Sequence, residues 1–281
     1  MGTGASDRDQ LFAGKIRDGG RVKTGIPAFD EMLHGGFMEG DSVMLAGSAG
    51  SGKTTLALQY LVNGTTRYND RGVYLTFEQL PDQIYRDALG FGWDLKKLEE
   101  EGRIQLICTS PDLMLDADAG DGLLRDTIKE FQPQRIVVDS LSHFGMYVPE
   151  NNLRKEVYRL IMAFKTKRIS SILLWETSQI MGNTLSISDA GLSFLVDSII
   201  LLKPVEIESS MRRLLGILKM RGSDHDKRLR EFEITSHGIE IQNPFTNYEG
   251  ILTGSPRRSQ IEAAANSWSM AFEGAKQKHA K

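Results

Sequence analysis

This chain lacks the features that would place it in an oxidising compartment or within a membrane. Its 281 residues include one cysteine, Cys108, so an internal disulfide framework is excluded. No stretch approaches the roughly 18 apolar residues that a membrane-spanning helix requires, and the N-terminus lacks a signal-peptide pattern. We therefore expect a soluble, cytoplasmic protein. Because Cys108 ends an apolar run, we expect it to be a buried structural thiol.

An excess of charge of either sign is also missing. The chain carries 34 Lys and Arg residues against 37 Asp and Glu residues, for a net charge of −3 at pH 7. That balance provides no global electrostatic case for a nucleic-acid partner, although a local basic patch in an assembly stays open. With 40% hydrophobic residues, the chain can bury a large core.

Strand-like and helix-like segments alternate through the first two thirds of the chain, which favours a mostly parallel α/β sheet with right-handed crossovers. The expected strands are 42–46, 72–77, 104–108, 135–139 and 170–175. The expected helices are 25–33, 55–62, 81–89, 95–101, 123–131 and 153–164, the second of them ending at Asn63-Gly64. Four closely spaced strand candidates then predict antiparallel additions at the sheet edge, at 198–202, 214–220, 230–235 and 238–241.

The most informative stretch is residues 47–55, which read Gly-Ser-Ala-Gly-Ser-Gly-Lys-Thr-Thr. This is the pattern of a phosphate-binding P-loop, and it stands between a strand candidate and a helix candidate, as that loop requires. Glycines let backbone N–H groups approach phosphate oxygens. Lys53 would reach the β- and γ-phosphates, and the Thr54 hydroxyl would bind Mg²⁺. A Gly/Ser-rich turn that matches by chance is the alternative. The predicted nucleotide-binding residues are Ser48, Ala49, Gly50, Ser51, Gly52, Lys53, Thr54 and Thr55.

Two acids follow strand candidates at the sheet edge where ligands of parallel α/β proteins bind, Glu78 and Asp139. Asp139 closes an apolar strand, as a Walker B aspartate does, and would hold Mg²⁺ together with Thr54. Its alternative role is an N-cap on the following turn. Glu78 would act as general base toward water, and its alternative is a solvated acid at a strand end.

Lys219 and Arg221 lie two residues apart on a strand candidate and therefore share one face. Such strand faces are ordinarily only solvated. An ATPase, however, needs a cation near the transferring phosphoryl group, and a neighbouring subunit often supplies it. Spacing alone leaves both readings open.

The chain resembles the KaiC family of RecA-like ATPases. The resemblance rests on the P-loop, on Phe77-Glu78-Gln79, on 135–140, and above all on the stretch from Lys219 to Lys227, which reads Lys-Met-Arg-Gly-Ser-Asp-His-Asp-Lys. It covers roughly residues 20–260, and the later part is closer to the second than to the first ATPase domain of circadian-clock KaiC.

This resemblance implies a homo-hexameric ring that binds and hydrolyses Mg·ATP between its subunits. One subunit would supply the P-loop, Glu78 and Asp139. Lys219 and Arg221 would reach the γ-phosphate of the neighbour's nucleotide, with His225 and Lys227 near the same nucleotide. The implied catalytic residues are Glu78, Lys53, Lys219 and Arg221, and the implied cofactors are ATP and Mg²⁺.

Two departures from the family pattern concern activity. The family usually carries two consecutive glutamates where this chain has Glu78 and Gln79. The Ser-Thr phosphorylation pair of the KaiC phosphotransfer domain aligns with Ser193 and Phe194. Because phenylalanine cannot accept phosphate, a two-site cycle is not expected. Autophosphorylation at Ser193 alone stays open, against a hydroxyl that only packs or caps.

We divide the chain into a flexible leader (1–20), a KaiC-like RecA-type ATPase domain (21–257) and an amphipathic basic tail helix (258–281). In the tail, apolar residues recur at helical spacing ahead of three lysines: Ile261, Ala265, Trp268 and Phe272, then Lys276, Lys278 and Lys281. This helix would dock a signalling protein, pack on its own domain, or stay disordered until it binds. Membrane attachment is the least favoured reading.

Three functions compete. The leading one is an oligomeric KaiC-like ATPase with slow hydrolysis and a signalling or regulatory role. The second is a scaffold that ATP assembles without being hydrolysed. The third is recombinase-like DNA binding, which the loop 182–189 disfavours because it carries no Lys or Arg.

Overall fold

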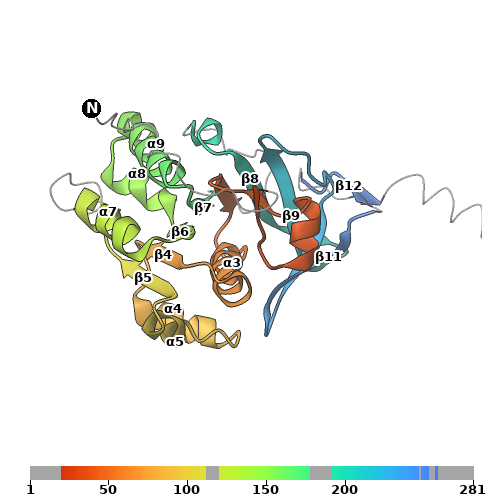
Figure 1. The fold of residues 1–281 in the computed structure, drawn as a ribbon. Helices are drawn as coiled ribbons and strands as arrows, with labels where there is room; N and C mark the ends of the chain where they lie inside the picture. The colour runs from red at the N-terminus through yellow and green to blue at the C-terminus, as the bar shows by residue number, and fades with distance from the viewer. Residues whose placement is uncertain (1–19, 112–119, 178–190, 247, 253–256, 259–281) are drawn as a thin grey trace, which may run out of the picture.

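The fold of the chain, seen in a computed structural model, is built on a nine-stranded sheet (Figure 1). The structure describes residues 20–111, 120–177, 191–246, 248–252 and 257–258. The helices are α2 (Pro27–Met32), α3 (Lys53–Tyr68), α4 (Pro81–Leu89), α5 (Leu95–Glu100), α7 (Gly120–Phe131), α8 (Phe144–Tyr147) and α9 (Glu150–Thr166). The strands of the large sheet are β3 (Ser42–Gly47), β4 (Gly72–Thr76), β5 (Ile104–Cys108), β6 (Arg135–Asp139), β7 (Ser170–Glu176), β8 (Ser198–Ile207), β9 (Ser210–Met220), β10 (Arg230–Thr235) and β11 (Gly238–Pro244). Two small ribbons pair β1 (Arg21–Val22) with β2 (Phe37–Met38) and β12 (Tyr248–Glu249) with β13 (Arg257–Arg258).

The strand order is β11-β10-β9-β8-β3-β7-β6-β4-β5, in which β8 to β5 run parallel and β9, β10 and β11 are antiparallel. This confirms the expected α/β class with a mostly parallel sheet and antiparallel strands at the C-terminal edge. The P-loop strand β3 lies in the interior of the sheet, between β8 and β7. Its carboxyl end therefore meets those of the neighbouring parallel strands at one edge.

Helices cover both faces of the parallel part of the sheet (Figure 1). Alternate residues of β3 enter two different core clusters. Val43 and Leu45 pack with α3 residues, and Met44 and Ala46 pack with α9 residues such as Phe164. This period of two is what a strand buried on both faces requires. It explains why the strand reads as a continuous apolar run.

The helix after the P-loop does not end at Asn63-Gly64, and that prediction is wrong. Helix α3 continues to Tyr68 and ends at Asn69, whose φ of 56° is left-handed. Gly64 lies inside the helix, and the side chain of Arg135 packs directly against it. A Cβ added at Gly64 would be 2.3 Å from the Arg135 Nε. The glycine therefore makes room for a buried neighbour and does not stop the helix.

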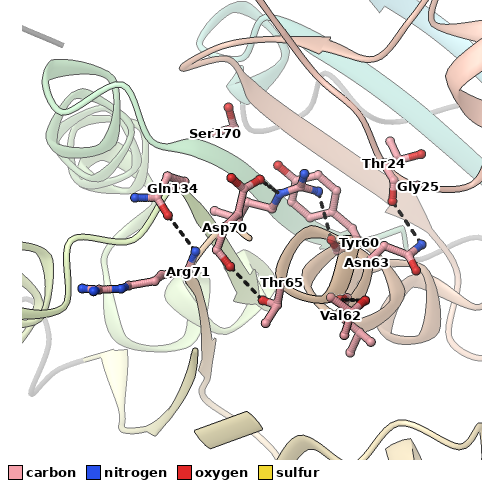
Figure 2. Close-up of polar contacts among 12 residues, drawn as sticks. Thr24, Gly25, Tyr60, Val62, Asn63, Thr65, Asp70, Arg71, Gln134 and Ser170 are labelled. Carbon is pink, nitrogen blue, oxygen red and sulfur yellow. Dashed lines mark hydrogen bonds and ion pairs between the residues drawn. The ribbon is translucent and has the colours of Figure 1, made fainter. Parts of the chain in front are cut away.

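Arg135 was expected only as the first residue of an apolar strand, yet its side chain is fully buried. Its Nε donates to Asp70 at 2.8 Å and its Nη1 donates to the Tyr60 carbonyl at 3.0 Å. Figure 2 labels these two partners, Asp70 and Tyr60. The guanidinium also lies over the rings of Tyr60 and Tyr68. The pairing and ring contacts compensate the desolvated charge, which is the condition for burying an arginine.

The other elements differ little from expectation, apart from longer β8 and β9, the short helix α8 and the two short ribbons, which were not predicted. Cys108 is a correction, because it is exposed. Its strand, β5, is the outermost strand of the parallel side, and among the described residues it pairs with β4 alone. Among the described residues, no helix is long and apolar enough to cross a membrane.

Candidate functional site

The loop between β3 and α3 is folded around the ammonium group of Lys53. This group donates hydrogen bonds to the carbonyls of Gly47 and Ser48, at 3.0 and 2.8 Å. Gly52 caps α3 with a φ of 97°, and Gly50 has a φ of 72°. Both φ values are left-handed, which favours glycine and leaves backbone N–H groups turned into the loop. The loop thus has the local backbone of a phosphate site at a helix N-terminus.

Two buried hydroxyls in this loop have no hydrogen-bond partner, those of Ser48 and Ser51. An unpaired buried hydroxyl costs free energy, of the order of 1–3 kcal/mol. A phosphate bound in the loop would supply acceptor oxygens, so these orphan donors fit an anionic ligand. The neighbouring Ala49 and Gly50 are exposed, and the loop is therefore open to solvent at its tip.

The electrostatics of the loop are set by burial and by nearby acids. Burial lowers the pKa of Lys53, while Glu176, Asp139 and Glu78 oppose that shift. Glu176 was missed by the sequence reasoning. It ends β7 directly beside Gly47 in the parallel register, so it joins the same edge. Its strand-end position was the signal that could have found it.

Thr54 and Asp139 meet, as expected for a shared metal ion. The Thr54 hydroxyl donates to Oδ2 of Asp139 at 3.0 Å, and the Tyr74 hydroxyl donates to the same oxygen at 2.5 Å. Asp139 is bonded to these two residues, and the turn after it has no side-chain cap. Tyr74, a second residue missed from the sequence, is fully buried, and burial together with the Asp139 charge raises its pKa well above the usual value. It stays protonated and can only donate to Asp139.

These oxygen donors fit Mg²⁺, which is held by one or two carboxylates and completed by phosphate oxygens and water. Within the described part of the chain, no three His, Cys, Asp or Glu side chains cluster to hold a metal by themselves. Thr54 and Asp139 would hold the ion, which would neutralise charge on the phosphates.

Glu78 follows the neighbouring strand β4, and its side chain is 61% exposed. The Thr76 hydroxyl accepts hydrogen bonds from the backbone N–H groups of Glu78 and Gln79, at 3.3 and 3.2 Å. The register pairs Thr76 with Asp139. Glu78 and Asp139 therefore lie at the same sheet edge, Asp139 turned inward and Glu78 outward.

Lys219 and Arg221 lie far from the P-loop of their own chain. Lys219 is paired with Ile199, and the Arg221 backbone N–H donates to the Asp197 carbonyl. The backbone N–H of Asp197 in turn donates to the carbonyl of Ser42, which begins β3. Gly47, where the P-loop begins, is five residues further along β3, which is about 16 Å in a strand. The two cations therefore cannot reach their own nucleotide.

Both cations instead hold the turn at Ser193. The Lys219 ammonium donates to the carbonyls of Ser193 and Val196, at 2.8 and 2.6 Å, and Arg221 donates to that of Phe194 at 3.3 Å. Burial and the charge of Arg221 lower the pKa of Lys219. The Phe194 side chain is 68% exposed, which is unusual for a ring of this size.

Of the remaining residues and segments that the sequence singled out, the structure describes some and leaves out others. His225 has a buried Nδ1 with no hydrogen-bond partner, and Lys227 is exposed and paired with Asp224 at 3.4 Å. Thr55 lies in the first turn of α3. The leader up to residue 19, the loop 182–189 and all of the tail beyond 258 lie outside the described residues.

Comparison with known proteins now identifies the domain, because a family model described as "ATPase: KaiC" matches residues 22–245. The chain belongs to the KaiC family. It is 37% identical over 245 residues to the "Circadian clock oscillator protein KaiC" of a Nostoc species, which is 87% of this chain and 47% of that protein. It is 35% identical over 260 residues to the protein of the same description in Rippkaea orientalis, which is 92% of this chain and 49% of that protein.

The KaiC domain of this chain spans about half the length of the curated relatives that it matches. Membership in the family establishes a nucleotide-binding ATPase domain, in agreement with the P-loop geometry.

Proposed function

We propose that this chain binds Mg·ATP and hydrolyses it at the interfaces of a homo-oligomeric, hexameric ring with a signalling or regulatory role. The observation that carries the proposal is the contact between Thr54 and Asp139 beside the Lys53 loop. These three side chains are the minimum set for holding a nucleotide with its metal ion. Glu78, exposed at the end of the next strand, accepts the proton of the attacking water.

The position of Lys219 and Arg221 supports the proposed ring. These cations lie near the amino ends of the parallel strands, whereas the P-loop lies at their carboxyl ends. They would therefore serve a phosphate only if it belonged to another copy of the chain. A head-to-tail interface supplies that geometry and closes into a ring when its rotation permits. The buried, unpaired Nδ1 of His225 and the exposed Lys227 belong to the same stretch, and the proposal assigns both to the surroundings of the neighbour's nucleotide.

The proposal includes one further activity, autophosphorylation, and one binding segment, the tail. Autophosphorylation at Ser193 is the possible kinase reaction, since its hydroxyl is part of the turn that Lys219 and Arg221 hold. The tail 258–281 is the proposed docking segment for a signalling protein. DNA binding is disfavoured by charge, and a non-hydrolysing scaffold is the alternative that turnover separates from the enzyme.

A complementation experiment tests hydrolysis and the shared site together. Turnover and native mass are measured for wild type, Glu78→Gln, Arg221→Ala and a mixture of the two variants, with label from the γ-phosphate of ATP followed on the protein. Each variant alone should lose at least tenfold in kcat. In a randomly mixed ring, about a quarter of the interfaces combine an intact Glu78 with an intact Arg221, and that share of wild-type activity should return.

Each outcome has a definite meaning. Recovery in the mixture supports a site formed by two subunits. Two inactive variants that still assemble but do not complement would refute the shared site. If the wild type assembles with ATP but does not hydrolyse it, the protein is a nucleotide-dependent scaffold and not an enzyme. If no label appears on Ser193, the autophosphorylation hypothesis is refuted.

A further inference from the structure

A histidine with no role in the proposed nucleotide site, His143, lies beside Glu78. His143 ends a 3₁₀ turn, Leu141–His143, that follows β6 and Asp139. Its Nδ1 is 3.1 Å from the hydroxyl of Ser140, and its Nε2 is 3.9 Å from Oε2 of Glu78. The His143 side chain is 22% exposed, whereas that of Glu78 is 61% exposed. A partly buried ring thus faces the free end of the proposed base.

The packing below this pair holds the two backbones together. Phe77 precedes Glu78 and Phe144 follows His143, and their rings pack edge to face with centroids 5.2 Å apart. Phe144 is fully buried, and the Phe77 N–H donates to the carbonyl of Asp139 at 2.9 Å. An aromatic pair of this geometry contributes about 0.5–1.5 kcal/mol beyond its buried area. The approach of His143 to Glu78 is therefore built into the core.

The proton of the imidazole can be assigned from these contacts. The Glu78 carboxylate can only accept a hydrogen bond, so in the neutral form of the ring the nitrogen that faces it, Nε2, is the one that carries the N–H. Nδ1 then accepts from the Ser140 hydroxyl. Ser140 fixes the tautomer and the ring plane, as the second partner of a histidine commonly does.

We propose that His143 is a positioning residue for Glu78 in ATP hydrolysis. The distance of 3.9 Å exceeds a hydrogen bond, but Glu78 is exposed and a small rotation of its side chain closes it. The N–H of His143 then occupies one carboxylate oxygen and leaves the other to accept the proton of water. This limits the rotamers that an exposed glutamate otherwise samples. Within the described part of the chain, His143 is the one cation-forming side chain in ion-pair range of that carboxylate.

This inference rests on the proposed role of Glu78, and its magnitude follows from positioning. A general base contributes about 10²–10⁴-fold to a rate, and loss of its orientation removes part of that factor. We expect His143→Ala to lower kcat about tenfold. KM for ATP should stay within about twofold, because the polar contacts of His143 among the described residues are with Ser140 and Glu78.

Two isosteric variants separate the Nε2 hydrogen bond from mere packing. In His143→Gln the side-chain amide N–H₂ falls near the position of Nε2, so it should keep kcat within about threefold of wild type. In His143→Asn the amide reaches only the position of Nδ1, so it should lose activity as His143→Ala does. His237→Ala, in the exposed turn between β10 and β11, is the matched control and should be unchanged.

The experiment measures kcat, KM for ATP and the thermal midpoint of the full chain for these variants, alone and combined with Glu78→Gln. His143→Ala should have no further effect in the Glu78→Gln background, since there is then no carboxylate to orient. The inference is overturned if Glu78→Gln is inactive while His143→Ala retains wild-type kcat, or if Gln and Asn are equally impaired. If the wild type does not turn over ATP, the proposed function fails and this role fails with it.

Discussion

The substitution Gly64→Ala offers the sharpest test of the packing around Arg135. We expect it to destabilise the protein, whereas the same substitution inside a helix usually stabilises it. Replacing an interior helical glycine with alanine normally stabilises a helix by about 1 kcal/mol. At Gly64 the added Cβ would lie 2.3, 2.5 and 2.6 Å from Nε, Cδ and Cζ of Arg135. That side chain is fully buried and held by Asp70 and by the carbonyl of Tyr60, so it cannot swing into solvent.

The cost can be bounded from two limits. If the helix moves away and the ion pair survives, overpacking costs about 1–3 kcal/mol. If the guanidinium is driven off Asp70, breaking the buried pair costs about 3–5 kcal/mol. The crowding of three Arg135 atoms favours the second limit. After subtracting the helix-propensity gain of about 1 kcal/mol, we expect Gly64→Ala to destabilise the protein by about 2–4 kcal/mol.

Urea unfolding without nucleotide, at one protein concentration, measures this change. With a slope of about 3 kcal/mol/M for a large domain, the midpoint should fall by roughly 1 M. Gly122→Ala is the matched control, since a Cβ there meets nothing within 4 Å and helix α7 should gain up to about 1 kcal/mol. In an Arg135→Ala background the cost of Gly64→Ala should vanish, because its cause is gone.

The reasoning is refuted if Gly64→Ala is as stable as wild type or more stable. That result would mean that Arg135 yields easily and that the length of α3 does not depend on a glycine at this position. A destabilisation that persists in the Arg135→Ala background would point instead to the helix backbone.

Two other predictions concern carboxylates. Burial and the charge of Asp197 raise the pKa of Asp41 from 3.8 to about 7, so the native state retains a proton that the unfolded chain loses, and stability should fall as pH rises from about 4 to about 7. Asp41→Asn should raise the free energy of unfolding at pH 8 by about 1–2 kcal/mol, a value already reduced for solvent screening, and should flatten this pH dependence. Denaturation at pH 4 and pH 8 measures both effects. An unchanged dependence of stability on pH would contradict the prediction. Tyr74→Phe removes the hydrogen bond to Asp139, worth about 0.5–1.5 kcal/mol, so the Mg²⁺ concentration for half-maximal turnover should rise about three- to tenfold. Unaltered Mg²⁺ dependence would separate Tyr74 from the metal site.

The features that depend on residues close in the chain could be predicted from the sequence. The P-loop backbone follows from glycines within a few positions of Lys53, and the strands and helices follow from periods of two and 3.6 residues. Alternation of these elements leaves few topologies, so the parallel sheet with its antiparallel edge also followed. The position of Asp139 and Glu78 on one side of the sheet could be predicted because the carboxyl ends of parallel strands lie together.

The strand order decided the rest. Placing β6 between β7 and β4 brings Arg135 against Gly64, Tyr74 onto Asp139 and His143 beside Glu78, across separations of 65 residues or more in each case. Local propensity treats Gly64 as a helix stop and Arg135 only as the first residue of an apolar strand, because it contains no information on what packs against them. The tertiary structure adds that information: a charge that finds its partners in the core needs a neighbour without a side chain, and only the folded sheet shows where that neighbour is.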